Sequence, residues 1–192
     1  PYHCLASPTP KVVKRTVIGL DKHAEQFDMM GFEPSHYNKI NIHVGGAYGD
    51  KEAALERFCE NFELLSDSTK KRLVVENDDS PNQYSVKMLH DWLHKEIGIP
   101  VVFDQHHFLY GPQDQSMEEA IKLAYSTWKT RVMTHMSSSK TLEDKTGRKT
   151  AHSDYIYEEI KTYGLDFDTE IEAKAKDLAV IKYRKQFQVI KS

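Results

Sequence analysis

Three carboxylates follow a short apolar run near the middle of the chain. Residues 73–75 are Leu-Val-Val, which is typical of a strand buried on both faces, and Glu76, Asp78 and Asp79 come directly after them. Carboxylates this close together repel one another and resist dehydration, so a bound cation is a simple way to hold them. A solvated acidic loop is the alternative, and this segment alone does not decide between the two.

Four further short runs also end in residue types that bind metals. Residues 39–42, 101–103, 131–134 and 167–171 lead into His43, Asp104, His135 and Glu172. In a (β/α) barrel the carboxyl ends of all strands meet at the face that carries the chemistry. Imidazoles mixed with carboxylates suit Zn, Mn, Fe or Mg rather than a cysteine-based structural site. The sequence therefore predicts a divalent metal centre at that face.

Amphipathic helices are expected between these strands. Apolar residues recur at spacings of three and four in most of the intervening segments. The predicted helices cover residues 13–27, 51–65, 85–97 and 116–128, with a short helix ending at Tyr163 and another from about Lys174 onward. Residues 136–150 are polar and mildly basic, which predicts a long loop that is functional or mobile.

The alternation of strands and helices predicts an α/β fold of the (β/α) TIM-barrel type. Five strands are too few to close such a barrel, which usually needs about 250 residues. The chain has 192 residues and begins with Pro1 rather than Met. We therefore expect residues 1–192 to form a single domain, the C-terminal portion of a barrel truncated at its N-terminus, with a smaller or open barrel as the alternative.

Composition indicates an ordinary globular protein and excludes few partners. Hydrophobic residues make up 39% of the chain and charged residues 29%, with a net charge of −3. No apolar run is long enough to cross a bilayer, and no signal-peptide pattern is present. Cys4 and Cys59 have no paired spacing, which argues against a disulfide framework and fits a reducing cytosol.

Six ordered motifs resemble the UV-damage endonuclease family, over about residues 5–176. The motifs occupy residues 42–51, 75–79, 102–107, 135–138, 152–155 and 171–174. The resemblance implies a metal-dependent barrel related to endonuclease IV, which nicks damaged double-stranded DNA on the 5′ side of UV photoproducts or other lesions. It also implies two or three divalent ions, usually Mn with Zn or Mg as alternatives. We expect a monomer in the cytoplasm, at the nucleoid if bacterial or in the nucleus if eukaryotic.

Carried over position by position, the resemblance also implies roles for individual residues. The expected metal ligands are His43, Glu76, Asp104, His107, His135, His152 and Glu172. From their position after Glu76 alone, Asp78 and Asp79 are expected to orient ligands. Glu76 would bridge two ions, and ions about 3.5–4 Å apart can activate water and stabilise a leaving oxygen. Catalytic roles are expected for Glu76, Glu172 and Lys174, and DNA contacts for His3, Cys4, Tyr48, Lys140, Arg148 and Lys174.

Three positions depart from the family pattern. Pro1 corresponds to the proline of an upstream His-Pro pair, and its histidine precedes the sequence. His3 and Cys4 stand where the family commonly has a glutamine and an aromatic residue that probe the lesion. Met133 replaces a lysine two residues before His135. These departures predict weak or absent activity of this chain on damaged DNA.

Two alternative functions fit parts of the same pattern. Sugar isomerases and epimerases also place Glu, Asp and His at barrel strand ends around divalent ions. The number of histidines and the basic loop favour phosphodiester chemistry over that reading. A degenerate homologue that binds DNA or metal without catalysis is the second alternative, which the departures support.

Overall fold

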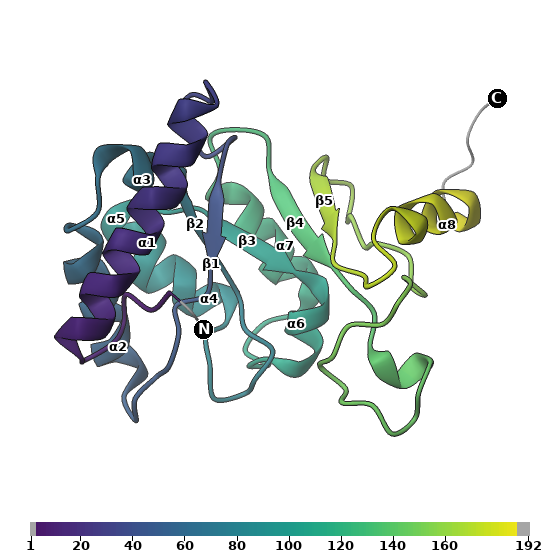
Figure 1. The fold of residues 1–192 in the computed structure, drawn as a ribbon. Helices are drawn as coiled ribbons and strands as arrows, with labels where there is room; N and C mark the ends of the chain where they lie inside the picture. Colours follow the sequence, from purple (N-terminus) through teal and green to yellow (C-terminus); the bar gives the residue numbers. More distant parts are fainter. Residues whose placement is uncertain (1–2, 188–192) are drawn as a thin grey trace.

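The computed structural model describes residues 3–187, which form one five-stranded sheet (Figure 1). All strands are parallel, and they are ordered as in the sequence. The strands are β1 (Ile40–Ile42), β2 (Leu73–Glu76), β3 (Val101–Asp104), β4 (Met133–Met136) and β5 (Asp168–Ile171). Consecutive parallel strands joined by helical crossovers form the repeating unit of a (β/α) barrel, so the predicted fold class is confirmed as a half-barrel.

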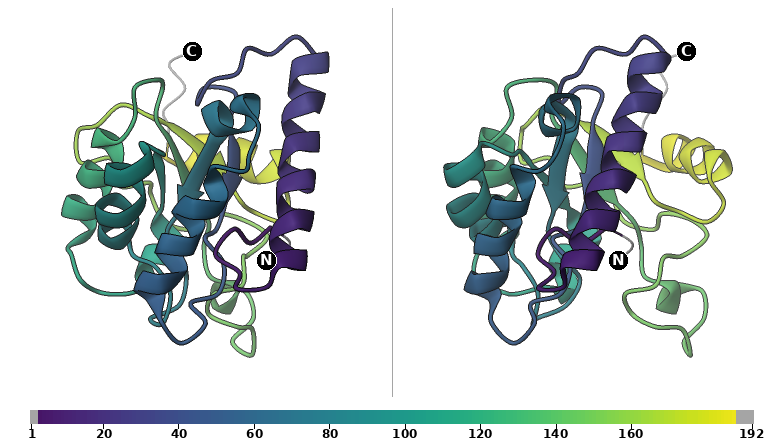
Figure 2. Two further views of the ribbon diagram at one scale, coloured as in Figure 1. Left: turned by 90° about the vertical axis from the view of Figure 1, so that its left-hand side faces the viewer. Right: turned by 60° about the vertical axis from the view of Figure 1, so that its left-hand side comes forward.

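Most helices lie on one side of the sheet, while α1 lies at its β1 end and α8 beyond β5. Figures 1 and 2 show α6 and α7 on one side of the sheet, with α1 in front of its β1 end. The helical segments are α1 (Pro10–Met29), α2 (Lys51–Phe62), α3 (Asp67–Arg72), α4 (Val86–Met88), η1 (Leu89–His94), α5 (Lys95–Ile97), α6 (Gln105–Tyr110), α7 (Met117–Ser126), η2 (Lys140–Leu142) and α8 (Asp177–Phe187).

The two faces of the central strands have different surroundings. Strands β2 and β3 are buried at every position, as their apolar sequences predict. Leu73 and Val75 belong to the main core, whereas Val74 packs in a separate apolar cluster with Val102. Because side chains alternate along a strand, Glu76 lies on the same face as Val74. The sheet therefore holds the carboxylate directly above an apolar layer.

Most predicted elements are present, with three changes in helix content. The helix predicted over 85–97 covers α4, η1 and α5, but its middle residues 89–94 wind as a π-helix. The short helices α3 and α6 were not predicted. The predicted long loop after β4 contains the 3-10 turn η2, and Ser139 pairs with His152 across the loop. The loop is therefore held by its own backbone contacts.

The short helix predicted to end at Tyr163 is absent, which corrects that expectation. Residues 155–163 have irregular backbone. Their amide groups bond to side chains from distant elements, since Ile160 N donates to the Tyr183 hydroxyl and Lys161 N donates to Gln105 Oε1. These bonds satisfy the backbone without a helix, and sequence periodicity cannot reveal such partners.

A buried arginine fastens the connection between α1 and β1. Arg72 has no exposed surface at the end of α3. Its guanidinium pairs with Asp28 Oδ1 at 2.6 Å and donates to the backbone carbonyls of Phe32, Glu33 and Asn38. Arginine suits this position because its planar group presents five donors at fixed angles.

Replacing Arg72 with Met should lower the free energy of unfolding by about 3 kcal/mol, because each acceptor left without its donor costs about 1–3 kcal/mol. Urea unfolding followed by circular dichroism measures this loss. The matched control is Arg131→Met, since Arg131 is 37% exposed and its partners Asp166 and Asp168 are more exposed still. An equal loss in the two variants would contradict the role given to Arg72.

Candidate metal centre

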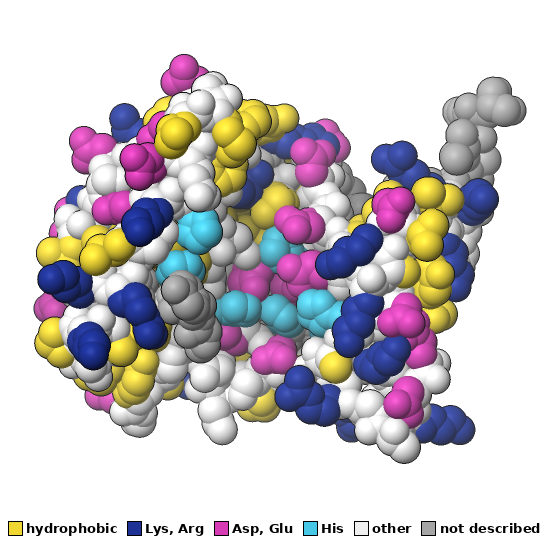
Figure 3. Space-filling view, viewed as in Figure 1, with side chains coloured by type: hydrophobic (Ala, Val, Ile, Leu, Met, Phe, Trp, Pro, Cys, Tyr) yellow, Lys and Arg dark blue, Asp and Glu magenta, His cyan; other side chains and the backbone are white. Residues whose placement is uncertain are grey.

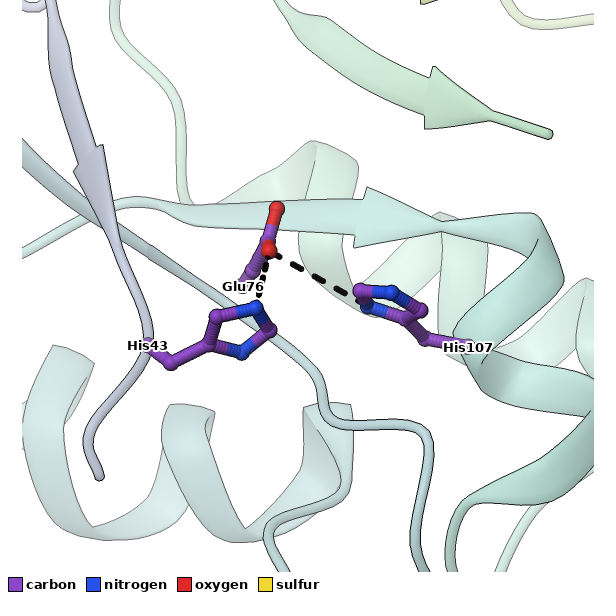
Figure 4. Close-up of side chains that lie close together, drawn as sticks. All are labelled: His43, Glu76 and His107. Atoms are coloured by element: carbon purple, nitrogen blue, oxygen red, sulfur yellow. Dashed lines mark ion pairs between the residues drawn. The ribbon is translucent and has the colours of Figure 1, made fainter. Parts of the chain in front are cut away.

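Glu76 is shared by two groups of potential ligand atoms. One group contains His43 and His107, and the other contains Asp104 and His135. Within each group, the ligand atoms lie within 4.8 Å of one another. Figure 4 shows the first group, in which Glu76 projects from the end of β2 toward the rings of His43 and His107. Five of the seven predicted ligands are thus brought together.

The two oxygens of Glu76 face different partners. Oε1 lies 2.6 Å from His43 Nε2 and 4.0 Å from His107 Nδ1. Oε2 lies 2.8 Å from His135 Nδ1. Asp104 Oδ2 lies between the histidines, 3.6 Å from His107 Nδ1 and 4.0 Å from His135 Nδ1. A carboxylate with one oxygen toward each ligand group has the geometry of a bridging ligand.

Several of these ligand atoms are buried without a hydrogen bond. Within residues 3–187, Asp104 Oδ2 and both ring nitrogens of His135 have no hydrogen-bond partner. His135 Nδ1 lies 2.8 Å from Glu76 Oε2, but this ion pair does not have the geometry of a hydrogen bond. Asp104 is fully buried and His135 is 3% exposed. Buried polar atoms in native proteins are nearly always satisfied, so this donor set fits one or more divalent cations.

Asp104 also begins the helix that carries His107. Its Oδ1 accepts a hydrogen bond of 2.8 Å from His107 N, which caps α6. The His107 ring is fixed in turn, because Nδ1 lies 3.0 Å from the carbonyl oxygen of Asn77. The Asn77 side chain pairs with both backbone groups of Asp104. His107 therefore reaches the site from a helix N-terminus rather than from the strand itself.

Two further residues orient the ligands around Glu76. Asp78 Oδ1 lies 2.9 Å from His43 Nδ1, as expected for a residue that orients a ligand. Asn41 Nδ2 donates to Glu76 Oε2 at 2.6 Å. The sequence reasoning missed Asn41. The available signal was an amide between Ile40 and Ile42 in a strand that is otherwise apolar.

The last two predicted ligands lie beside the second group. Glu172 Oε1 is 3.4 Å from His135 Nδ1, and Glu172 Oε2 is 3.8 Å from His152 Nε2. Figure 3 shows histidine and acidic side chains in a band across the middle of this face. His152 and Glu172 fall outside the two close groups, and their coordination of a metal stays a prediction.

Two predicted DNA contacts are engaged elsewhere in the structure: Cys4 is buried, and Lys140 forms ion pairs with nearby carboxylates. Cys4 is 4% exposed, and its thiol lies 3.1 Å from the Tyr48 hydroxyl, so Cys4 cannot meet a ligand in this conformation. Lys140 pairs with Glu143 at 2.7 Å and with Asp154 at 3.2 Å, so its charge already has local partners. Its amino group links two segments of this region, and its contact with a phosphate stays a prediction.

The other predicted DNA contacts are accessible. Tyr48 is 51% exposed, His3 is partly exposed, and Arg148 and Lys174 are exposed. Tyr48 has a left-handed backbone with φ of 52°, which is uncommon outside glycine. The departure at Pro1 lies outside the described residues.

The carboxylates around the centre raise the pKa values of His43 and His135 and so favour their charged forms. Burial lowers the pKa of His43, but the carboxylates of Asp78 and Glu76 outweigh it and raise that pKa to about 10. Burial likewise lowers the pKa of His135. The carboxylate of Glu76, with a smaller contribution from Glu172, outweighs burial and raises that pKa to about 9. Burial would raise the pKa of Glu76, yet the two histidines hold it well below its usual value. The pKa of Glu172 is raised, chiefly by burial.

Comparison with known proteins assigns the family. The family model of the UV-endonuclease UvdE matches residues 1–192. The chain belongs to the UvdE family. The predicted resemblance is therefore confirmed over the whole chain.

Curated UvdE relatives are longer than this chain. A UV DNA damage endonuclease of Bacillus mycoides is 36% identical over 190 residues, which cover 94% of this chain and 58% of the relative. One of Clostridium perfringens is 34% identical over 190 residues, which cover 94% of this chain and 44% of the relative. The chain thus spans about half the length of these two relatives.

Two solved structures share the fold. The crystal structure of SacUVDE matches with a TM-score of 0.82 and 32% identity, covering 98% of this chain and 64% of that one. The 3-keto-D-glucoside 4-epimerase YcjR of E. coli matches with a TM-score of 0.65 at 7% identity, covering 95% of this chain and 75% of that one. The second likeness concerns the fold alone. Within residues 3–187, no helix is long and apolar enough to span a membrane.

Manganese should raise the melting temperature of the chain relative to EDTA, because a cation bound only by the folded state stabilises it. The gain is about 2.7 kcal/mol when the free ion is at 100 times its Kd. Thermal melts of the wild type and of Glu76→Gln measure the effect, and the variant should lose most of it. Glu118→Gln, an exposed glutamate paired with Lys122, is the control and should keep it. Coincident wild-type midpoints in manganese and in EDTA would contradict a metal site here.

Metal binding at pH 7 should release about two protons, one each from His43 and His135. His43 and His135 have pKa values of about 10 and 9, so both are protonated at pH 7, whereas a metal binds only the neutral imidazole. The apparent affinity should accordingly fall as the pH decreases and rise until both rings are neutral. Manganese titrations by calorimetry in two buffers of different ionisation enthalpy count the protons. An observed heat that is independent of the buffer would contradict this charge state.

Proposed function

We propose that this chain carries the metal site of an endonuclease that hydrolyses a phosphodiester bond of damaged double-stranded DNA, on the 5′ side of a UV photoproduct or another lesion. Membership of the UvdE family supports the reaction class. The observation that carries the proposal is the buried Glu76 carboxylate, whose two oxygens face separate ligand groups. We further propose that manganese is the resident metal and that the protein acts as a monomer.

The residues around Glu76 have distinct tasks in this reaction. His43, His107, Asp104 and His135 would hold two ions together with Glu76. Such ions, when bound, lower the pKa of a water and stabilise the charge of an in-line displacement. Asn41 and Asp78 keep the ligands in one orientation, which matters because small displacements of reacting groups slow a reaction strongly.

Glu172 and Lys174 would act on the substrate side of the centre. Glu172 is partly buried beside other acids, and its raised pKa makes it a better proton acceptor than an ordinary carboxylate. Lys174 is exposed two residues further on, where an ammonium group would contact a phosphate. Their nearness in the chain would place proton transfer and phosphate binding side by side.

The charge around the centre supports a polyanionic substrate. Figure 3 shows Lys and Arg side chains beside the band of histidines and acids, over the loop after β4 and the start of α8. Cationic side chains position DNA through its phosphates. Tyr48 lies on the loop after β1 and offers an exposed ring for contact with a base or a sugar. Arg148 and Tyr48 would thus meet the duplex from different elements.

Met133 gives the centre an apolar floor. Its side chain packs against the cluster of Val74, Val102 and Trp128, beneath the ligands. Met133 itself brings no charge, whereas the Lys39 ammonium lies over the Trp128 ring of the same cluster. This substitution supports the expectation of low catalytic activity.

A sugar epimerase or isomerase is the alternative enzyme class. The E. coli epimerase has the same fold at 7% identity, so the fold does not distinguish the two reactions. The family assignment and the basic flank favour phosphodiester hydrolysis. A non-catalytic homologue is distinguished from both by direct assay.

In a reaction that contains manganese, with protein in excess over the duplex, the chain should slowly nick a duplex that holds one UV photoproduct. The nick should lie on the 5′ side of the lesion. Glu76→Gln should remove this activity, because both ligand groups lose their shared carboxylate. Labelled duplexes resolved on a denaturing gel measure the position and the rate. Glu118→Gln and an undamaged duplex are the controls.

The result that overturns the proposal is the absence of any Glu76-dependent cleavage while manganese still raises the melting temperature. That outcome would indicate a metal-binding but non-catalytic homologue. Epimerisation of a keto sugar in place of DNA cleavage would assign the site to the alternative class.

A further inference from the structure

Two histidines outside the metal centre share one face of the helical crossover from β2 to β3. His90 and His94 lie on η1, four residues apart. Their rings are stacked, with centroids 5.5 Å apart and planes inclined by 24°. Residues at this spacing are neighbours on a helix surface, so both rings can approach one ion.

Each ring is oriented through its Nδ1 atom. His90 Nδ1 lies 3.0 Å from Asp91 Oδ1, and His94 Nδ1 lies 3.1 Å from the carbonyl oxygen of Ile99. Histidines that bind metals typically donate their second ring nitrogen to a carboxylate or a backbone carbonyl in this way. The hydrogen bonds place a proton on Nδ1 and leave Nε2 of both rings as the atom that can coordinate.

The acid that orients His90 is itself held in place. Asp91 pairs with Lys95 at 2.7 Å and with Lys87, each one helical turn away. These partners keep the carboxylate charged and neutralise it, so Asp91 acts as an acceptor for His90 rather than as a competing ligand. His90 and His94 are both only partly buried, which leaves an ion room to enter with its water.

The π-helical winding coincides with this pair. Residues 89–94 are the π-helical part of the crossover, with α-helical turns on either side. A π-turn within an α-helix is rare and frequently marks a functional site. The backbone irregularity and the oriented imidazole pair therefore coincide at the same residues.

We propose that Nε2 of His90 and Nε2 of His94 bind one borderline divalent cation, such as Zn, Ni or Cu(II), with water completing the coordination shell. Imidazole ligands without carboxylates suit these ions, whereas Mn and Mg are favoured where carboxylates contribute ligands, as Glu76 and Asp104 do in the metal centre. The bound ion clips two residues of η1 together and stabilises the crossover. The site does not depend on the proposed endonuclease function.

Nickel is the probe. The imidazoles of the centre around Glu76 also bind nickel more tightly than manganese, so the equivalent that belongs to this site is identified by its loss in the variants. Calorimetric titration of the wild type should show one equivalent of nickel bound at this site. Either His90→Gln or His94→Gln should weaken the nickel affinity of this site by at least about tenfold. Removing a residue that only orients a metal ligand already costs about that much. Asp91→Asn should weaken it about tenfold for the same reason. His36→Gln, in the loop between α1 and β1, is the matched control and should leave the isotherm unchanged.

The proposal is overturned if the wild type and both histidine variants give the same nickel isotherm, or if the control weakens binding equally. His94→Gln also removes a contact with Ile99, so circular dichroism must confirm that it is folded. His90→Gln leaves that contact in place and decides the question if His94→Gln unfolds.

Discussion

The site depends on one desolvated carboxylate. Glu76 ends a strand that is buried on both faces, and its charge is balanced by imidazoles from separate elements. A buried unpaired carboxylate is strongly unfavourable, so removal of its partners destabilises the region around it. The strand supplies the position, while His43 and His135 supply the countercharge. Positioning, protonation state and metal affinity at this face are consequences of the same burial.

The ligands at the strand ends could be predicted from the sequence, but most of the contacts that position them could not. Apolar runs broken by Glu76, Asp104 and His135 are visible without a structure, because buried parallel strands have continuous apolar sequence. His107 was found through the family motif, but its placement on the first turn of α6 was not expected. Asn41 was missed because one amide in a strand carries little signal until its hydrogen-bond partner is known.

The wrong expectations share a physical cause. The irregular segment before Tyr163 was read as a helix because its backbone partners are side chains far away in sequence, including Tyr183. Cys4 was expected to contact DNA from its place in the family pattern, and the Tyr48 hydroxyl beside its thiol belongs to a different element. Local patterns predict which residues a strand or helix contains. They do not predict contacts whose energy comes from tertiary packing.

Asp104 has two structural roles, and both affect how the phenotype of a substitution at this position is interpreted. One carboxylate oxygen caps α6 at His107 N, and the other faces the ligand cluster. Asparagine keeps an oxygen for the cap and loses charge, whereas alanine removes the cap as well. A phenotype of Asp104→Ala therefore mixes a lost ligand with a frayed helix start that carries His107. Only the difference between the alanine and asparagine variants separates coordination from scaffolding.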